Sequence, residues 1–563
     1  MRMIKLKVTL FAFLLLNACS GGDSDSVQDV NFDLNTISQE ILIRRDQPLM
    51  LNLQSITRED EENSIFKYIW DFGDGNYSEG GSVVHRYSQP GCYQVSLSTF
   101  SGDQEITKTT KPIRIVGGNP EILEDFQIDG IPSDNDLIPR DTETNTGYIN
   151  LEINYPNPNF ETLIVRTYVN GQVDYESKTE LCGEFKDIEI PIFAERQERN
   201  IDISLSALGK ETKVGSAERI IAGDMFLVNG QSNAVSREFL GSADENLDRF
   251  VRSYGSRSEY VEIHELDSLW HTAVVGESVG GPGAIGQWPL RMARELSLRF
   301  NMPIGVINSG HGDRQISYFQ RNDLNPLDLN TNYGRALDRT IRSKAMGKVR
   351  AILFYQGESD KGNAIAHKEG FTELYRDWSD DYYDIEKIYI TQIRSGCGGQ
   401  QGGQLETREA QRQLAENLPK ISIMSTTGLD GHDGCHFSYE NGYRELGDRY
   451  ANLISRDLYS SQGEADLEPI NVVSATLDSD IITIKTSSDA SKLIINEGIE
   501  SSFQLHGGTR SILSIRRQGN DLLVDLGPGE NPSMIGYGGH SGSGPWIINA
   551  KGVGLLAFLL PIN

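Results

Sequence analysis

Residues 224–234 read Asp-Met-Phe-Leu-Val-Asn-Gly-Gln-Ser-Asn-Ala, a short apolar run that passes directly into a glycine and three polar residues. The apolar run predicts a buried strand that ends at Gly230. Ligands bind at the carboxyl ends of the strands in open α/β sheets, so Ser232 is a candidate nucleophile. A serine hydroxyl needs a base to take its proton, and the segment from Asp433 to His436 supplies a histidine. Taken alone, a serine at this place more often only caps a helix.

Strands and helices alternate from about residue 222 to residue 462, which is typical of a parallel sheet with helices on both faces. The expected strands are 225–229, 304–309, 350–355, 387–392 and 421–427. The expected helices are 284–300, 333–345, 368–380, 405–416 and 439–458. Because crossovers of this length are right-handed, the pattern predicts a three-layer α/β domain.

Short alternating strands separated by polar turns predict β-sandwiches in the rest of a multidomain chain. The three regions are 31–117, 118–221 and 463–563. In the last region the expected strands are 470–476, 481–486, 492–495, 511–518, 521–526 and a buried strand over 554–560. A chain of 563 residues is long enough for roughly three to five domains.

The amino-terminal segment has the features of a targeting signal. Residues 1–18 carry basic residues and then an apolar run about half as long as a bilayer needs, typical of a secretory signal. The ending Leu16-Asn17-Ala18-Cys19 resembles a bacterial lipoprotein lipobox, which implies cleavage before Cys19 and attachment of lipid, including palmitate, to that cysteine. Ordinary cleavage is the alternative. Residues 19–30 are small and acidic, as in a flexible tether, and 20–28 resemble surface-export signals of Bacteroidetes lipoproteins.

The charge of the chain restricts its partners. The formal net charge is −28 at pH 7 and the pI is near 4.8. Nucleic acids and anionic membrane surfaces are bound through basic patches, so neither is expected as a partner. We therefore expect an acidic protein of the bacterial cell envelope that reaches the outer membrane through lipid at Cys19 and faces outward.

A second resemblance lies in the first β region. The run from Trp70 to Gly75 reads Trp-Asp-Phe-Gly-Asp-Gly, and His85-Arg-Tyr-Ser-Gln-Pro-Gly-Cys-Tyr93 follows it. Both segments resemble a PKD (polycystic kidney disease) domain, and the resemblance covers most of 31–117. Such modules are spacers or weak carbohydrate binders, so Trp70 is expected in the core.

Four strand ends carry polar motifs in a recognisable order. They are Gly-Gln-Ser-Asn over 230–233, Gly-His-Gly-Asp-Arg over 310–314, Gln-Gly-Glu-Ser-Asp over 356–360 and Asp-Gly-Cys-His over 433–436. Together they resemble the SGNH (GDSL-like) hydrolases, in the branch of the sialate O-acetylesterases and acetylxylan esterases. The resemblance covers the α/β domain, and more faintly the C-terminal sandwich, and implies a flavodoxin-like parallel sheet.

The resemblance also implies roles for single residues. Ser232 would attack an ester carbonyl, His436 would act as general base and acid, and Asp433 would orient the imidazole. The negative oxygen of the tetrahedral intermediate needs fixed donors, for which the candidates are the amides of Ser232 and Gly312 and the side chain of Gln356.

The second motif departs from the family. Trp-Gly-Gly-Thr is usual there, whereas this chain has His311, Gly312, Asp313 and Arg314, which puts oxyanion geometry and substrate fit in doubt. Arg314 either pairs with Asp313 or contacts an acidic sugar. His311 either lines the pocket or only packs. Glu358 is expected to be structural, orienting Gln356 or a neighbouring helix.

Cysteines and histidines leave two further points. Apart from Cys19 there are four cysteines, which allow three full pairings; Cys397 and Cys435 share a domain and form the favoured disulfide. His432 is expected to be a solvated loop residue, and no second His, Asp or Cys cluster stands at ligand spacing, so neither a metal nor a cofactor is expected.

These observations predict a surface-anchored serine carboxylic-ester hydrolase that removes acetyl groups from an acetylated carbohydrate, with a polysaccharide favoured over free sialic acid. Two alternatives stay open. One is a catalytically impaired lipoprotein that binds polysaccharide for a glycan-utilisation system, and the other is a lipase or thioesterase of the same fold. The sugar, the linkage and the oligomeric state do not follow from the sequence.

Overall fold

The computed structural model describes most of the chain from residue 28 onward. The described residues are 28–32, 41–44, 48–53, 66–116, 128–153, 160–182, 186–207, 210–238, 241–276, 281–360, 362–397, 404–460, 466–486, 493–539 and 541–563. The expected signal peptide, Cys19 and nearly all of the expected tether lie outside these residues. The chain folds into two compact units. The first comprises 1–132, 149–190 and 199–217, and the second comprises 133–148, 191–198 and 218–563.

The first unit begins with a small β-sandwich. One sheet has the order β1 (Gln28–Phe32), β3 (Pro48–Leu53), β6 (Ser82–Arg86), and the other has the order β2 (Ile41–Arg44), β8 (Gln104–Val116), β7 (Gly91–Ser101), β4 (Phe66–Asp71), β5 (Tyr77–Glu79). Trp70 is completely buried in its core, next to Phe72, Val95 and Leu97. The hallmark tryptophan is therefore a core residue, as the sequence predicted.

The second β region is an antiparallel arrangement around β12 (Thr162–Val169), which pairs with β13 (Gln172–Glu180) and β15 (Arg199–Ala207). β9 (Ile128–Asp129), β11 (Thr146–Ile153) and β14 (Lys186–Phe193) complete its strands. A disulfide joins Cys92 to Cys182 within this unit. Residues 133–148 and 191–198, which the sequence assigned to this region, belong instead to the second unit.

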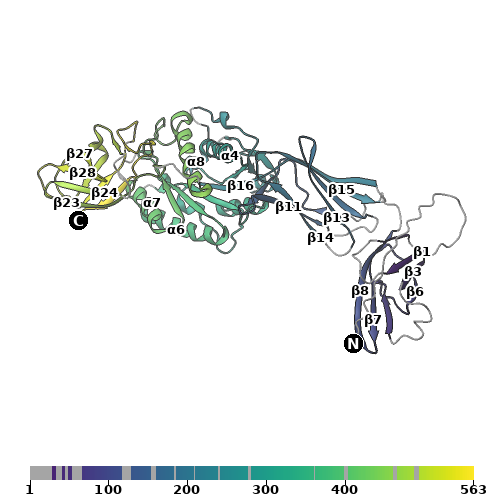
Figure 1. Cartoon of the computed structure of the whole chain (residues 1–563). Coiled ribbons are helices and arrows are strands. Elements are labelled where there is room, and N and C mark those ends of the chain that lie inside the picture. Colours follow the sequence, from purple (N-terminus) through teal and green to yellow (C-terminus); the bar gives the residue numbers. More distant parts are fainter. Residues whose placement is uncertain are drawn as a thin grey trace. The chain divides into compact units, whose positions relative to one another are not determined.

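A parallel sheet forms the centre of the second unit (Figure 1). Its order is β17 (Val251–Tyr254), β19 (Ile304–Asn308), β16 (Lys210–Gly230, from residue 218 in this unit), β20 (Val349–Tyr355), β21 (Lys387–Thr391), β22 (Ile421–Met424). Two short edge elements, β17 and its antiparallel partner β18 (Trp270–Thr272), were not expected. Without them the order is that of flavodoxin-like sheets, and β16 lies at the point where the order reverses.

Helices cover both faces of this sheet. They are α2 (Ser232–Val235), α3 (Val261–Leu266), α4 (Gln287–Phe300), α5 (Asn332–Arg342), α6 (Ala364–Asp381), α7 (Leu405–Asn417) and α8 (Arg444–Tyr459), with a π-helical turn, η5 (Tyr439–Tyr443), before α8. In Figure 1, α4 and α8 lie on one side of the sheet and α6 and α7 on the other. The rings of Trp288 on α4 and Tyr450 on α8 lie 5.1 Å apart. In the described part of the chain, no helix is both long enough and apolar enough to span a bilayer.

The C-terminal strands also belong to the second unit. One sheet has the order β23 (Val472–Asp478), β24 (Ile481–Thr486), β28 (Asp521–Leu526), β27 (Ile512–Gln518), and another has the order β26 (Phe503–His506), β29 (Met534–Tyr537), β31 (Phe558–Pro561). β25 (Ile494–Ile495) pairs with β30 (Ile547–Ile548). The expected strand over 554–560 is regular only from Phe558, although Leu555, Leu556 and Ala557 before it are buried.

The end of β16 needs glycine. Gly230 has φ +127°, in the region that L side chains rarely adopt. A Cβ atom there would overlap the carbonyl group of Tyr355 on β20. Because Gly230 has no side chain, the turn that carries Ser232 can lie directly against β20.

We predict that Gly230→Ala destabilises the second unit by at least about 3 kcal/mol, because it adds backbone strain and a steric overlap. Gly519→Ala is the matched control: Gly519 also has a positive φ, of +60°, but nothing lies within 4 Å of its added Cβ. Gly519→Ala should lower the free energy of unfolding by about 1–2 kcal/mol. Thermal unfolding of both variants checks the difference, and equal losses would contradict the steric argument.

Candidate active site

The candidate nucleophile stands on a turn that is held to two strands. The N–H of Gln231 donates to Tyr355 O at 2.8 Å, and α2 begins at the next residue. The side-chain oxygen of Gln231 accepts hydrogen bonds from the N–H groups of Gly357 (3.2 Å) and Ser359 (3.0 Å). Ser232 is half-buried, so its hydroxyl remains accessible on a fixed turn.

Asp433 and His436 meet within one short loop between β22 and η5. His436 Nδ1 lies 3.3 Å from Asp433 Oδ2, and the N–H groups of Cys435 and His436 both donate to Asp433 Oδ1 at 2.7 Å. Partial burial raises the pKa of Asp433, but the two N–H groups and the imidazole outweigh it, so the pKa lies below the usual value. The carboxylate is therefore ionised at neutral pH and faces Nδ1, which leaves Nε2 for another partner.

The serine and the histidine line the same cavity, of about 160 Å³. The lining residues are Ser232, Val235, Arg237, Gly312, Asp313, His436 and Tyr443. No hydrogen bond joins Ser232 Oγ to the His436 ring in the described part of the chain. Catalytic hydrogen bonds of this kind often tighten only when substrate is bound.

Two backbone N–H groups belong to residues that line this cavity, Ser232 and Gly312. Gly312 lines the cavity, and a Cβ added to it would lie 4.0 Å from the Cβ of Ser232. Within the described residues, neither the N–H of Ser232 nor that of Gly312 donates a hydrogen bond. Both are thus available to an oxyanion beside the serine hydroxyl.

Gln356 does not fill the oxyanion role that the sequence assigned to it. Its side chain is fully buried, and its Nε2 donates to Asp360 Oδ2 at 2.9 Å and to Arg314 O at 3.2 Å. Because an amide nitrogen carries two protons, both are already used. Asp360 can accept a hydrogen bond from the Gln356 side chain because it lies four residues later, on the turn that follows β20.

Arg314 and His311 have partners that the sequence did not indicate. Arg314 lies 3.7 Å from Glu259 and stacks on the ring of Tyr318, and among the described residues it does not pair with Asp313. It lines neither this cavity nor the adjoining one. His311 Nε2 lies 2.8 Å from the same Glu259, and His311 lines the adjoining cavity.

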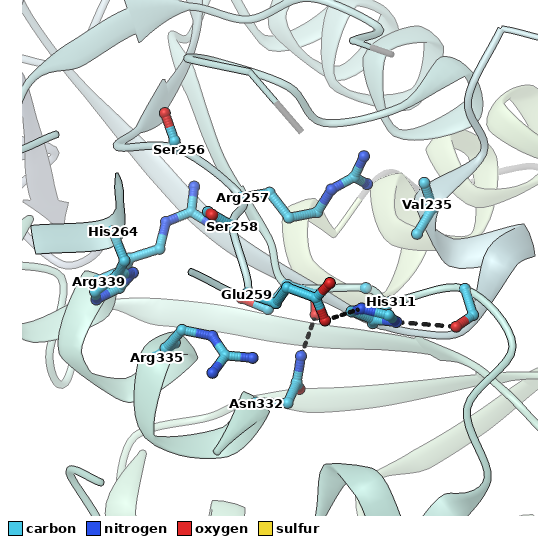
Figure 2. A pocket seen from close by; sticks show the side chains of 13 residues that line it. Val235, Ser256, Arg257, Ser258, Glu259, His264, His311, Asn332, Arg335 and Arg339 are labelled. Atoms are coloured by element: carbon cyan, nitrogen blue, oxygen red, sulfur yellow. Dashed lines mark hydrogen bonds and ion pairs between the residues drawn. The ribbon is translucent and has the colours of Figure 1, made fainter. Parts of the chain in front are cut away.

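That adjoining cavity, of about 70 Å³, shares Val235 and Gly312 with the first. Figure 2 shows the side chains that line it. Its other lining residues are mostly polar and buried, including Arg257, Arg335, Arg339, Asn332 and His264. Arg339 donates to the carbonyl oxygens of Tyr254 and Asn308, at 2.5 and 2.8 Å. This arginine therefore fixes the ends of β17 and β19 beside the cavity.

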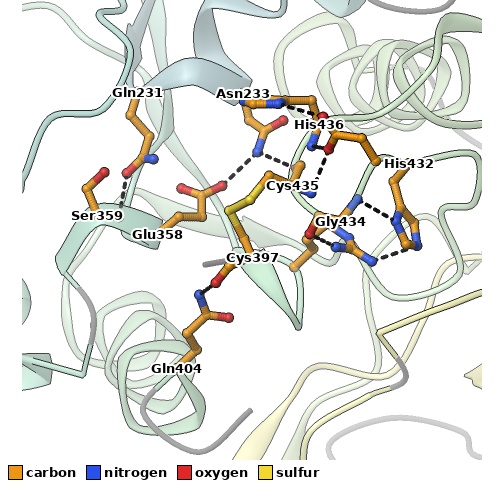
Figure 3. Close-up of a disulfide and its surroundings, with 12 residues drawn as sticks. Gln231, Asn233, Glu358, Ser359, Cys397, Gln404, His432, Gly434, Cys435 and His436 are labelled. Carbon is orange, nitrogen blue, oxygen red and sulfur yellow. Dashed lines mark hydrogen bonds and ion pairs between the residues drawn. A yellow bond between two sulfur atoms is a disulfide. The ribbon is translucent and has the colours of Figure 1, made fainter. Parts of the chain in front are cut away.

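Asn233 links the parts of the site, a role that sequence reasoning missed. Its fully buried side chain donates to Glu358 Oε1 at 2.8 Å and to Cys435 O at 3.1 Å, and it accepts from the hydroxyl of Tyr443 at 2.6 Å. Three segments thus meet at the side chain of Asn233 (Figure 3). They are the turn that carries Ser232, the turn after β20, and the loop between β22 and η5 that carries His436. The motif at 230–233 included Asn233 and was the only signal for it.

Of the two partners expected for Glu358, Gln356 or a neighbouring helix, its contact fits the second, because it accepts a hydrogen bond from Asn233 on α2. Burial raises its pKa to about 7, and the nearby Asp360 acts in the same direction, while the hydrogen bond from Asn233 opposes the shift. Its Oε2 has no hydrogen-bond partner among the described residues. A buried carboxyl group of this kind exchanges its proton near neutral pH.

A disulfide joins Cys397 to Cys435, the pairing that the sequence favoured (Figure 3). Cys397 follows β21, and Cys435 stands immediately before His436. His432 is not a solvated loop residue: its Nε2 lies 2.6 Å from the guanidinium group of Arg394. The disulfide and the contact with Arg394 thus hold the loop that carries His436.

Comparison with known families agrees with this geometry. Residues 222–456 match the family described as "Carbohydrate esterase, sialic acid-specific acetylesterase", and residues 43–116 match the PKD domain. Residues 222–456 are a carbohydrate esterase domain of this family. The four motifs at the strand ends all lie inside this esterase domain.

Solved structures resemble the chain at low sequence identity. A carbohydrate acetylesterase from Xanthomonas citri aligns with a TM-score of 0.53 and 17% identity over 77% of this chain and 99% of its own, and shares the fold. A family two carbohydrate esterase from Cellvibrio japonicus aligns with a TM-score of only 0.27 and 12% identity, over 59% of this chain and 98% of its own.

A curated relative matches a short stretch. Collagenase ColA of Clostridium perfringens is 30% identical over 121 residues, which is 19% of this chain and 11% of the collagenase. The chain thus spans about a tenth of that relative's length.

We predict that the stability of the esterase domain falls between about pH 5 and pH 7 in part because of Glu358. Its pKa is about 7 in the folded chain and about 4.3 in an unfolded one, so the folded state binds more protons in this range. The free energy of unfolding then falls as pH rises, by up to about 4 kcal/mol from this group over its whole titration.

The test is Glu358→Gln, which cannot lose a proton and should flatten this fall. Thermal midpoints at pH 5, 6, 7 and 8 measure it, with Glu373→Gln on the exposed face of α6 as matched control. Parallel curves for Glu358→Gln and the unaltered protein would show that Glu358 does not titrate in this range.

Proposed function

We propose that this protein is a carbohydrate O-acetylesterase that works through Ser232, His436 and Asp433. One observation carries the proposal: Ser232 and His436 line one cavity while Asp433 Oδ2 lies 3.3 Å from Nδ1 of the same imidazole. The esterase family of residues 222–456 supports the reaction type.

The reaction would proceed in two steps. Ser232 Oγ attacks the acetyl carbonyl carbon while His436 takes the hydroxyl proton and then gives it to the leaving sugar oxygen. Water then attacks the acetyl-serine, with His436 again as base, and acetate leaves. Asp433 stabilises the imidazolium that forms in each step. The N–H groups of Ser232 and Gly312 stabilise the two tetrahedral oxyanions, at about 3–4 kcal/mol for each donor.

The cavity favours short acyl groups on polar substrates. Arg237, Asp313 and His436 line it together with a single aliphatic side chain, Val235. Sugar hydroxyls can bond to such groups, whereas a long acyl chain needs apolar contacts. A PKD domain in the same chain as the esterase domain fits an enzyme that works on a polymer, so we propose an acetylated polysaccharide as the substrate.

We further propose that the protein is anchored at the bacterial surface through lipid on Cys19. The support is the lipobox-like sequence Leu16-Asn17-Ala18-Cys19 and the acidic tether after it. A lipid anchor at the amino terminus would leave the esterase domain free to reach a polymer outside the cell.

We predict that Ser232→Ala lowers kcat for an aryl acetate and for an acetylated xylan by at least about 1,000-fold, because the nucleophile is lost. Ser379→Ala is the matched control, since this serine lies exposed on α6, and it should keep full activity. Release of chromophore and of acetate measures the rates.

Equal rates for Ser232→Ala and the unaltered protein would contradict the proposed mechanism. An unaltered protein that releases no acetate but binds the polymer would be the impaired binding lipoprotein. Faster hydrolysis of an aryl octanoate than of the acetate would instead identify a lipase or thioesterase.

For the anchor, we predict that Cys19→Ala moves the protein from the membrane fraction to the soluble fraction and abolishes its labelling by radioactive palmitate, because no other cysteine stands at the lipobox position. Fractionation of expressing cells measures both. Retention of the label in Cys19→Ala would exclude this anchor.

A further inference from the structure

The segment that follows β21 holds the loop of the catalytic histidine at several points. Arg394 donates through one terminal nitrogen to Gly434 O, and its other terminal nitrogen lies 2.6 Å from His432 Nε2. The same nitrogen donates to Ser541 O, also at 2.6 Å, in the C-terminal β region. One guanidinium group thus joins three separate parts of the chain.

Arg394 is a buried charged residue, and side chains that only fill space in a protein interior are rarely charged. It is 95% buried, and burial lowers its pKa. Among the described residues it forms no ion pair, and its partners are carbonyl oxygens and an imidazole. A buried cation without a paired anion costs free energy unless its hydrogen bonds are well placed. The planar fork of donors fits this single arrangement of the loop.

Cys397 fixes the same loop three residues further along. Its disulfide reaches Cys435, with the two Cα atoms 4.4 Å apart. Gly434 and Cys435, the two residues immediately before His436, are thus each held by the segment that follows β21. The Cys435 carbonyl is also held by Asn233 on the other side.

We propose that Arg394 and Cys397 are positioning residues that hold His436 in line with Ser232. This inference rests on the proposed function. Neither residue lines the cavity of Ser232, so both act through the loop and not through substrate. An error of about 1 Å in the position of a catalytic group can cost about 100-fold in rate.

The first test is Arg394→Met, which keeps much of the volume and removes the donors. We expect kcat for an aryl acetate to fall by about 100-fold with KM little changed, because the base is misplaced while the cavity is kept. Inactivation of Ser232 by a sulfonyl fluoride should slow in parallel, because it needs the same base. Arg394→Lys keeps the charge and should recover part of the loss.

The second test compares the two disulfides of the chain. Cys397→Ser with Cys435→Ser should lower kcat with KM little changed, whereas Cys92→Ser with Cys182→Ser, which removes the disulfide of the first unit, should leave kcat unaltered. Circular dichroism and thermal unfolding establish that each variant is folded at the assay temperature. If a variant is unfolded at the assay temperature, its rate of inactivation by the sulfonyl fluoride is measured at a lower temperature at which the variant is folded.

The outcomes separate this inference from the proposed function. The positioning role alone would be overturned by one combination of results. In it, Ser232→Ala loses activity, while kcat is unaltered in the folded Arg394→Met variant and in the folded variant with both Cys397→Ser and Cys435→Ser. A rise in KM with unaltered kcat would overturn it too, because it would place these residues in substrate binding. Activity that survives Ser232→Ala would overturn the proposed function first.

Discussion

The site depends on the parallel pairing of β16 with β19 on one side and β20 on the other. Parallel strands in register bring their carboxyl ends to the same edge, so the turns that carry Ser232, Gly312 and Gln356 meet there without further help. Gly230 makes the approach close enough, because a side chain at this position would overlap the Tyr355 carbonyl. The sheet itself thus places the proposed nucleophile, Ser232, and one proposed oxyanion donor, the N–H of Gly312.

The proposed base, His436, is held in a different way, by contacts of side chains with its loop. His436 lies on a loop after β22, which β20 and β21 separate from β16, so the sheet alone would leave it loosely held. Asn233, Arg394 and the disulfide to Cys397 hold the residues that precede it. Arg394 also reaches Ser541, so the C-terminal β region contributes to the support of this loop. This contact gives a physical reason for the two regions to form one compact unit.

Buried polar groups next to the cavity follow one rule. Each is held by hydrogen bonds to the backbone or to another buried side chain, as with Gln231, Asn233 and Gln356. Such a network fixes one arrangement because any alternative would leave a buried donor or acceptor unpaired. Two oxygens have no hydrogen-bond partner among the described residues, Gln356 Oε1 and Glu358 Oε2. Of these two residues only Glu358 is ionisable, and its pKa is about 7. Glu358 is thus the member of the network whose charge changes near neutral pH.

The sequence by itself determined the strands β16, β19, β20, β21 and β22 and the motifs at their ends, because apolar periodicity and turn glycines are local signals. It also placed Asp433 and His436 within reach of each other, because they are only three positions apart, and their side chains lie 3.3 Å apart. Only the tertiary structure decided the partners: Glu259 for Arg314, Asp360 for Gln356, and Asn233 for Glu358. It also added the edge strands β17 and β18, which are too short to give a periodic signal. A side chain bonds to whichever group packing brings within reach, and for most of these pairs that group comes from a distant segment of the chain.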